Sequence, residues 1–150
     1  MPRSIRLFTA LATLVAATGC DSIFGSSERE LRREGIISYH EMPVTVSIPS
    51  EVTAGVPFQV SVRTYGPGCY SMGGLNVVEV PGGVQLLPYD YLTVNGSQAC
   101  PQGVQNFDHV AQVTLAAPGD AVLTVIGVSI QVSGASRVRQ EVPVQVNPAS

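Results

Sequence analysis

Two stretches near the C-terminus decide the fold: AVLTVIGV at residues 121–128 and VRQEVPVQV at residues 138–146. In the second stretch, one alternating set of positions is mostly valine and the other is charged, proline or glutamine. That pattern predicts a strand with one face on a core and one face in solvent. In the first stretch both alternating sets are apolar, which predicts a central strand. Pro143 has no N–H to donate to a ladder, so we expect an exposed strand edge there.

The same period of two recurs upstream and is interrupted by turn signals. The turns are PGG at residues 81–83 and PGD at residues 118–120. Five further strands are predicted, at residues 44–48, 58–64, 76–80, 84–87 and 107–115. Seven short strands without a long amphipathic helix predict an all-β fold, a single antiparallel β-sandwich over residues 43–148.

Two short motifs in this region resemble bacterial immunoglobulin-like domains. IPSEVTAGVPF at residues 48–58 is similar to the hairpin between their first two strands, and PGDA at residues 118–121 is similar to a later turn. The resemblance implies an immunoglobulin-like sandwich. Tryptophan is absent, and the penultimate strand carries no tyrosine for a tyrosine corner. An antibody-type domain is therefore excluded, and only the general class is implied.

The N-terminus has the organisation of an export signal. Residues 1–6 carry two arginines, residues 7–17 are uncharged, and ATGC follows at residues 17–20. The uncharged run would span about 16 Å as a helix, too short for a bilayer core of about 30 Å. The order of these parts resembles the lipobox signal of bacterial lipoproteins, with alanine where leucine is usual. The resemblance implies cleavage after residue 19 and lipidation of Cys20. The alternative is an ordinary secretory signal with a free Cys20.

Residues 20–42 are predicted to be a charged tether between the lipidated cysteine and the sandwich. SERE at residues 27–30 has the spacing of a capping box, so a short helix over residues 28–34 is expected. Ile36, Ile37 and Tyr39 are apolar enough to begin the folded part, as an edge strand.

The cysteine count fits an exported protein. Setting Cys20 aside leaves Cys69 and Cys100, 31 positions apart, which predicts one disulfide. The alternative is two free thiols. The spacing excludes a CxxC metal or redox motif.

Composition excludes some functions and offers little chemistry. Without Arg3 and Arg6, six of the eight basic residues remain against eleven acids, so no nucleic-acid partner is expected. The chain has two histidines, too few for the usual copper or zinc sandwich sites, and no cofactor is expected. His109 shares a strand face with Phe107, Ala111, Val113 and Leu115, so we expect a buried structural histidine. The alternative is an enzyme or metal carrier that uses His109 with Asp90 or Asp108.

The region 66–107 is rich in glycine and tyrosine and is expected to form long loops held by the disulfide. Aromatic loop residues are common binding anchors, so Tyr70, Tyr89, Asp90 and Tyr91 are predicted to form a binding surface. The alternative is that these rings cap the end of the sandwich, half buried.

Together these features predict a non-enzymatic lipoprotein of a bacterial cell envelope, on the periplasmic or outer-surface side. Its partners would be the membrane, through the lipid, and a protein or glycan. A subunit of a larger envelope assembly, joined by strand-edge pairing, is the alternative.

Overall fold

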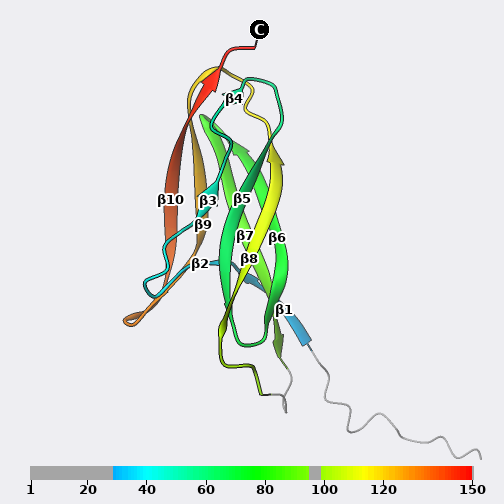
Figure 1. Ribbon diagram of the computed structural model, residues 1–150, viewed down its shortest axis with the longest axis vertical. Coiled ribbons are helices and arrows are strands. Elements are labelled where there is room, and N and C mark those ends of the chain that lie inside the picture. The colour runs from blue at the N-terminus through cyan, green and yellow to red at the C-terminus, as the bar shows by residue number, and fades with distance from the viewer. Residues whose placement is uncertain (1–28, 95–98, 150) are drawn as a thin grey trace, which may run out of the picture.

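The computed structural model describes residues 29–94 and 99–149, which form strands and connecting turns (Figure 1). This part of the chain contains no helix, and hence none long and apolar enough to cross a membrane. Its strands are β1 (Arg29–Glu34), β2 (Ile36–Tyr39), β3 (Val46–Ser47), β4 (Val52–Thr53), β5 (Phe58–Pro67), β6 (Tyr70–Val80), β7 (Gly83–Val94), β8 (Val104–Val113), β9 (Gly119–Gln131) and β10 (Gly134–Asn147).

The strands form two sheets that pack on a shared core. The larger, seven-stranded sheet has the path β1-β7-β9-β10-β4, with β2 also on β9 and β6 also on β7. The smaller sheet has the order β3-β5-β8. The predicted all-β, two-sheet class is confirmed. A purely antiparallel arrangement is not, because β7 and β2 pair with β9, and β4 with β10, in parallel.

The larger sheet is forked. The parallel strands β7 and β9 pair only over residues 83–86 and 122–125 and then diverge. The N-terminal strands fill the fork: β1 runs along β7, and β2 continues along β9. Gly35 joins the two arms, because its N–H donates to Pro88 O at 2.8 Å and its carbonyl accepts from Val128 N at 2.9 Å. Figure 1 shows β2 crossing between the two arms.

A glycine is required at this junction. A Cβ on Gly35 would lie 2.7 Å from Thr64 Cγ2 and 3.0 Å from the Pro88 carbonyl oxygen. Pro88 also suits the junction. Its carbonyl accepts from Gly35, and β7 no longer pairs with β9 at this position, so a backbone N–H would have no partner on β9; proline has none to leave unpaired.

The expected helix over residues 28–34 is wrong, and so is the start of the folded part at residue 43. Residues 29–34 pair with residues 89–94 of β7 in a continuous antiparallel ladder. The capping-box spacing is a local signal, and pairing along the open side of β7 overrides it. β2 pairs with β9 alone, as expected of an edge strand, but it lies inside the fork, and its Ile37 is fully buried.

The core lies between the sheets and is mostly aliphatic. Its fully buried members include Val60 and Val62 of β5, Leu86 of β7, and Leu123 and Val125 of β9. The central position predicted for residues 121–128 is confirmed, because β9 pairs with β10 on one side and with β7 and β2 on the other. The edge predicted at Pro143 is confirmed as well, since β10 has a partner on its outer side only at Val146 and Asn147.

The region expected to form long glycine- and tyrosine-rich loops is mostly strand. β6 and β7 form one long hairpin, ten or more residues in each strand, where short strands were predicted. The glycines at positions 73 and 74 look like turn signals but instead lie under the ring of Tyr89. A Cβ on Gly74 would be 2.8 Å from Tyr89 Oη, and one on Gly73 would collide with the Tyr89 carbonyl. These glycines therefore allow close approach inside a strand.

Candidate functional site

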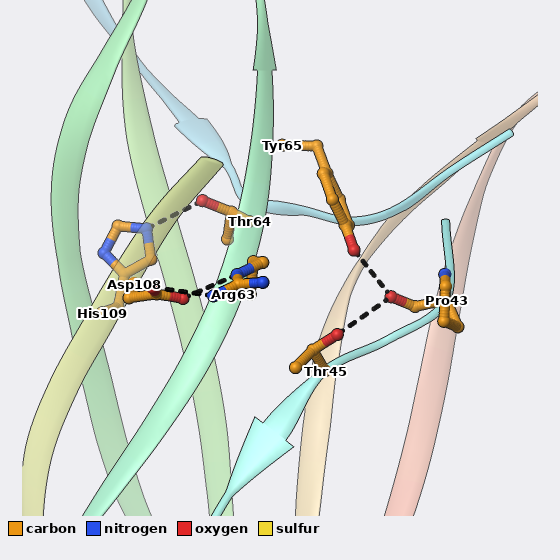
Figure 2. Close-up of polar contacts among 7 residues, drawn as sticks. All are labelled: Pro43, Thr45, Arg63, Thr64, Tyr65, Asp108 and His109. Atoms are coloured by element: carbon orange, nitrogen blue, oxygen red, sulfur yellow. Dashed lines mark hydrogen bonds and ion pairs between the residues drawn. The ribbon is translucent and has the colours of Figure 1, made fainter. Parts of the chain in front are cut away.

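Three polar side chains meet inside the sandwich. Thr64 of β5, Asp90 of β7 and His109 of β8 are 0%, 0% and 2% exposed. His109 Nε2 lies 2.8 Å from Thr64 Oγ1 and 3.0 Å from Asp90 Oδ1. Figure 2 shows the contact between His109 and Thr64, which lie on neighbouring strands. The prediction that His109 is buried and hydrogen-bonded is confirmed.

This polar cluster does not have the geometry of a catalytic triad. A triad places the hydroxyl on one imidazole nitrogen and the carboxylate on the other. Here Thr64 and Asp90 both approach Nε2, so no proton relay runs through the ring. All three side chains are also closed off from solvent. The arrangement links strands of both sheets.

One atom of the cluster is left without a partner. Asp90 Oδ1 also accepts a long bond of 3.4 Å from Gly73 N, but the buried Asp90 Oδ2 has no hydrogen-bond partner. A buried carboxylate oxygen without a partner costs free energy. Asp90 therefore depends strongly on His109 for its place in the core.

Asp108 is not the partner of His109. It lies on the opposite, exposed face of β8 and accepts two hydrogen bonds from Arg63 of β5, at 2.8 and 2.9 Å (Figure 2). The hydrogen bond from Arg63 lowers the pKa of the Asp108 carboxyl below its ordinary value. The same bond raises the pKa of the Arg63 guanidinium. Of the two partners considered for His109, the structure selects Asp90.

A second contact in Figure 2 fixes the segment between β2 and β3, which joins the larger sheet to the smaller one. The hydroxyl of Tyr65 donates to the carbonyl of Pro43 at 2.9 Å, and Thr45 Oγ1 makes a longer bond of 3.5 Å to the same oxygen. Tyr65 is only 4% exposed. The sequence offered no signal for this role, because the contact joins residues 22 positions apart.

Of the predicted binding residues, one lies in the core and three lie at the surface. Asp90 is wrong as a surface residue, because alternation along β7 turns it into the core. Tyr89 and Tyr91 lie on the outer face of the same strand, half buried, with their rings edge to face at 5.8 Å. Tyr70 is half buried at the start of β6. None of the three tyrosines stands on a loop.

Arg32 belongs to this surface but was not predicted. Its guanidinium lies 3.6 Å from the centre of the Tyr89 ring, a cation–π contact. The contact depends on the pairing of β1 with β7, which brings together residues far apart in the sequence. A shallow depression of about 320 Å³ beside them is lined by Arg32, Arg33, Glu34, Asn76, Leu87, Pro88 and Tyr89.

The predicted disulfide is confirmed. Cys69 and Cys100 are bonded, with their Cα atoms 5.0 Å apart, at the end of the sandwich where β6 begins. A backbone bond from Gly68 N to Gly103 O, 3.2 Å long, runs beside it. Gly68 has a φ of +67°, and a Cβ there would lie 3.0 Å from Cys100 Cβ. Glycine therefore suits this position on both counts.

Within the described ranges no group of three or more histidine, cysteine or acidic side chains could hold a metal ion. Cys20, the predicted lipidation site, lies outside those ranges. No protein-family model, curated protein or solved structure matches the chain.

Proposed function

We propose that this chain is a lipid-anchored protein of a bacterial cell envelope, which presents an immunoglobulin-like sandwich as a non-enzymatic binding or structural module. The observation that carries the proposal is the bond between Cys69 and Cys100. It uses two of the three cysteines and leaves Cys20, directly after the signal-like segment, for lipidation. A disulfide also suits an exported protein.

The burial of His109 supports the non-enzymatic part. A general base must reach the proton that it removes. His109 is 2% exposed, and its Nε2 faces both Thr64 and Asp90. His40, the other histidine, has its ring edge to face with Tyr39 at 4.4 Å, outside the polar cluster.

The outer face around Tyr89 is the surface we propose for a protein or glycan partner. Tyr89, Tyr91 and Arg32 are held against one another there by ring and cation–π contacts. Rigid aromatic side chains lose little conformational entropy on binding, and tyrosine and arginine are enriched in binding hot spots.

The lipid anchor is tested by changing Cys20→Ala in the full chain and following acyl labelling and membrane fractionation. We expect the variant to lose the label and to leave the membrane fraction. The matched control is Cys69→Ser/Cys100→Ser, which removes the other two cysteines and should keep the label. A Cys20→Ala chain that still carries acyl label would contradict the anchor.

A second candidate function, a subunit of a larger assembly, is favoured by a specific observation. The outer side of β10 is unpaired from its start to residue 145. An open edge of this length is a template for a further strand.

A further inference from the structure

The outer edge of β10 is the longest open edge in the described part of the molecule. β10 pairs with β9 along its whole length, but on the other side only Val146 and Asn147 meet β4. The two other long outer strands, β6 of the larger sheet and β8 of the smaller sheet, lie next to each other across the sandwich. Figure 1 shows β10 at the left margin of the molecule, with no labelled element outside it.

The register with β9 determines which groups of β10 face outward. Gln131 and Gly134 pair across a two-residue hairpin loop, so even-numbered residues of β10 bond to β9. The odd-numbered residues then turn their N–H and C=O groups outward. The bond from Ala54 N to Asn147 O, 2.9 Å, agrees with this alternation. The open groups belong to Ala135, Arg137, Arg139, Glu141, Pro143 and Gln145.

We propose that the occupant of this edge is the same strand of a second copy, antiparallel, with Gln140 on the two-fold axis. If the two-fold axis is perpendicular to the sheet, the inner faces of the two copies of β10 lie on the same side of the joined sheet, and so do their outer faces. Only residues of equal parity can then lie opposite each other, so the possible registers are few.

Charge selects among these registers. With Gln140 on the axis, Arg139 lies opposite Glu141 of the second copy, and this pair occurs twice. With Val138, Arg139 or Glu141 on the axis, two like charges face each other, and like charges directly opposite are destabilising. In the single chain Arg139 Nε lies 3.2 Å from Glu141 Oε1, and both side chains are well exposed, at 57% and 61%. Each can therefore exchange this exposed partner for its counterpart in the second copy.

The same register pairs apolar residues on the inner face. Val138 lies opposite Val142 of the second copy, and both valines are only half buried in the single chain. Arg137 lies opposite Pro143, which lacks an N–H, so that pair forms a single backbone bond. Arg137 already has an internal partner, Glu34, at 2.8 Å.

Pairing replaces two contacts of the single chain, the ion pair between Arg139 and Glu141 and one hydrogen bond of Gln140. Gln140 Nε2 donates to the Glu141 carbonyl at 3.1 Å, and this carbonyl faces outward. In the pair, the N–H of Arg139 from the second copy takes over this acceptor. The inference rests on the assembly role proposed above, but it is independent of the lipid anchor.

Cross-linking in cells tests the register. Residues facing each other at the two-fold axis have Cα atoms about 4.5 Å apart, within the range of a disulfide. In the full chain expressed in its envelope, we expect Gln140→Cys to give a covalent dimer on non-reducing gels. The control is Ser136→Cys, an exposed position of the same strand whose two copies would be about 27 Å apart. Equal cross-linking of both variants, or none of Gln140→Cys, would overturn the proposal.

Charge exchange tests the contacts themselves. In the detergent-solubilised full chain, Arg139→Glu should raise the dimer dissociation constant by about tenfold, because two attractive pairs become repulsive. Adding Glu141→Arg should restore the dimer. Arg63→Glu, on the smaller sheet, changes the net charge equally and should have no effect. Sedimentation of the unaltered chain as a monomer, or a double variant as weak as the single, would refute the pairing. If Gln140→Cys forms the covalent dimer but Cys20 of the same chain carries no acyl label, only the proposed lipid anchor is contradicted.

Discussion

Removal of His109 alone should destabilise the protein far more than removal of His109 and Asp90 together. In His109→Leu, Asp90 Oδ1 loses its 3.0 Å contact with Nε2 and keeps only the 3.4 Å bond from Gly73 N. Its other oxygen has no partner to begin with. The variant therefore leaves a carboxylate in the core with almost no compensation.

The magnitude follows from the burial of both groups. Removing one partner of a buried ion pair costs about 3–5 kcal/mol, whereas replacing both with apolar residues is often neutral or stabilising. We expect His109→Leu to lose about 3–5 kcal/mol of unfolding free energy. His109→Leu/Asp90→Val should lose about 2 kcal/mol or less, because no buried carboxyl group without a partner then remains.

Chemical denaturation of the oxidised chain, followed by far-UV circular dichroism, measures these differences. The single variant Asp90→Val completes the double-mutant cycle and gives the coupling energy between the two residues. A free energy of unfolding of His109→Leu within about 1 kcal/mol of that of the parent would refute the reasoning. A double variant with a loss equal to the sum of the singles would also refute it, since the pair would then be uncoupled.

Three further perturbations follow from the contacts described. Changing Cys69 and Cys100 together to serine should cost about 3–4 kcal/mol in denaturation experiments, because the loop of 31 residues is no longer closed in the unfolded chain; a loss below about 1 kcal/mol would contradict this. Gly74→Ala should cost about 1–3 kcal/mol, because its Cβ would lie 2.8 Å from Tyr89 Oη, and Tyr89→Ala should relieve the clash in the double variant. In carboxyl-detected NMR titrations, Arg63→Gln should raise the pKa of Asp108, since the hydrogen bond from Arg63 is what lowers it. Because the pKa of Asp108 is lower in the folded state, its pair with Arg63 stabilises the fold at pH values above the ordinary carboxyl pKa, and this contribution is lost as the pH falls through the lowered pKa. An unchanged pKa of Asp108 in Arg63→Gln would contradict Arg63 as the cause.

The sequence by itself determined the features that local pattern encodes. Alternation with period two predicted the all-β class, the central place of residues 121–128 and the buried face that carries His109. Counting cysteines predicted the bond between Cys69 and Cys100. The predictions from alternation succeed because the pattern of a strand decides which of its faces is buried.

Which residues would meet was decided by the tertiary structure. The segment 29–34 overlaps the capping-box spacing at residues 27–30 and carries many charges, yet it is a strand because β7 offers it an unpaired side in the fork. The glycines at 73 and 74 signal a turn by composition, yet they lie in β6, where the backbone and ring of Tyr89 occupy the space of their missing side chains.

The polar cluster shows the same division most clearly. Alternation placed His109 in the core, but no local pattern distinguishes Asp90 from Asp108 as its partner. That choice depends on which strand lies across the sandwich from β8 and on its register, and both are set by contacts between residues distant in the chain. A strand pattern specifies faces, whereas partners are specified only when the sheets are assembled and packed.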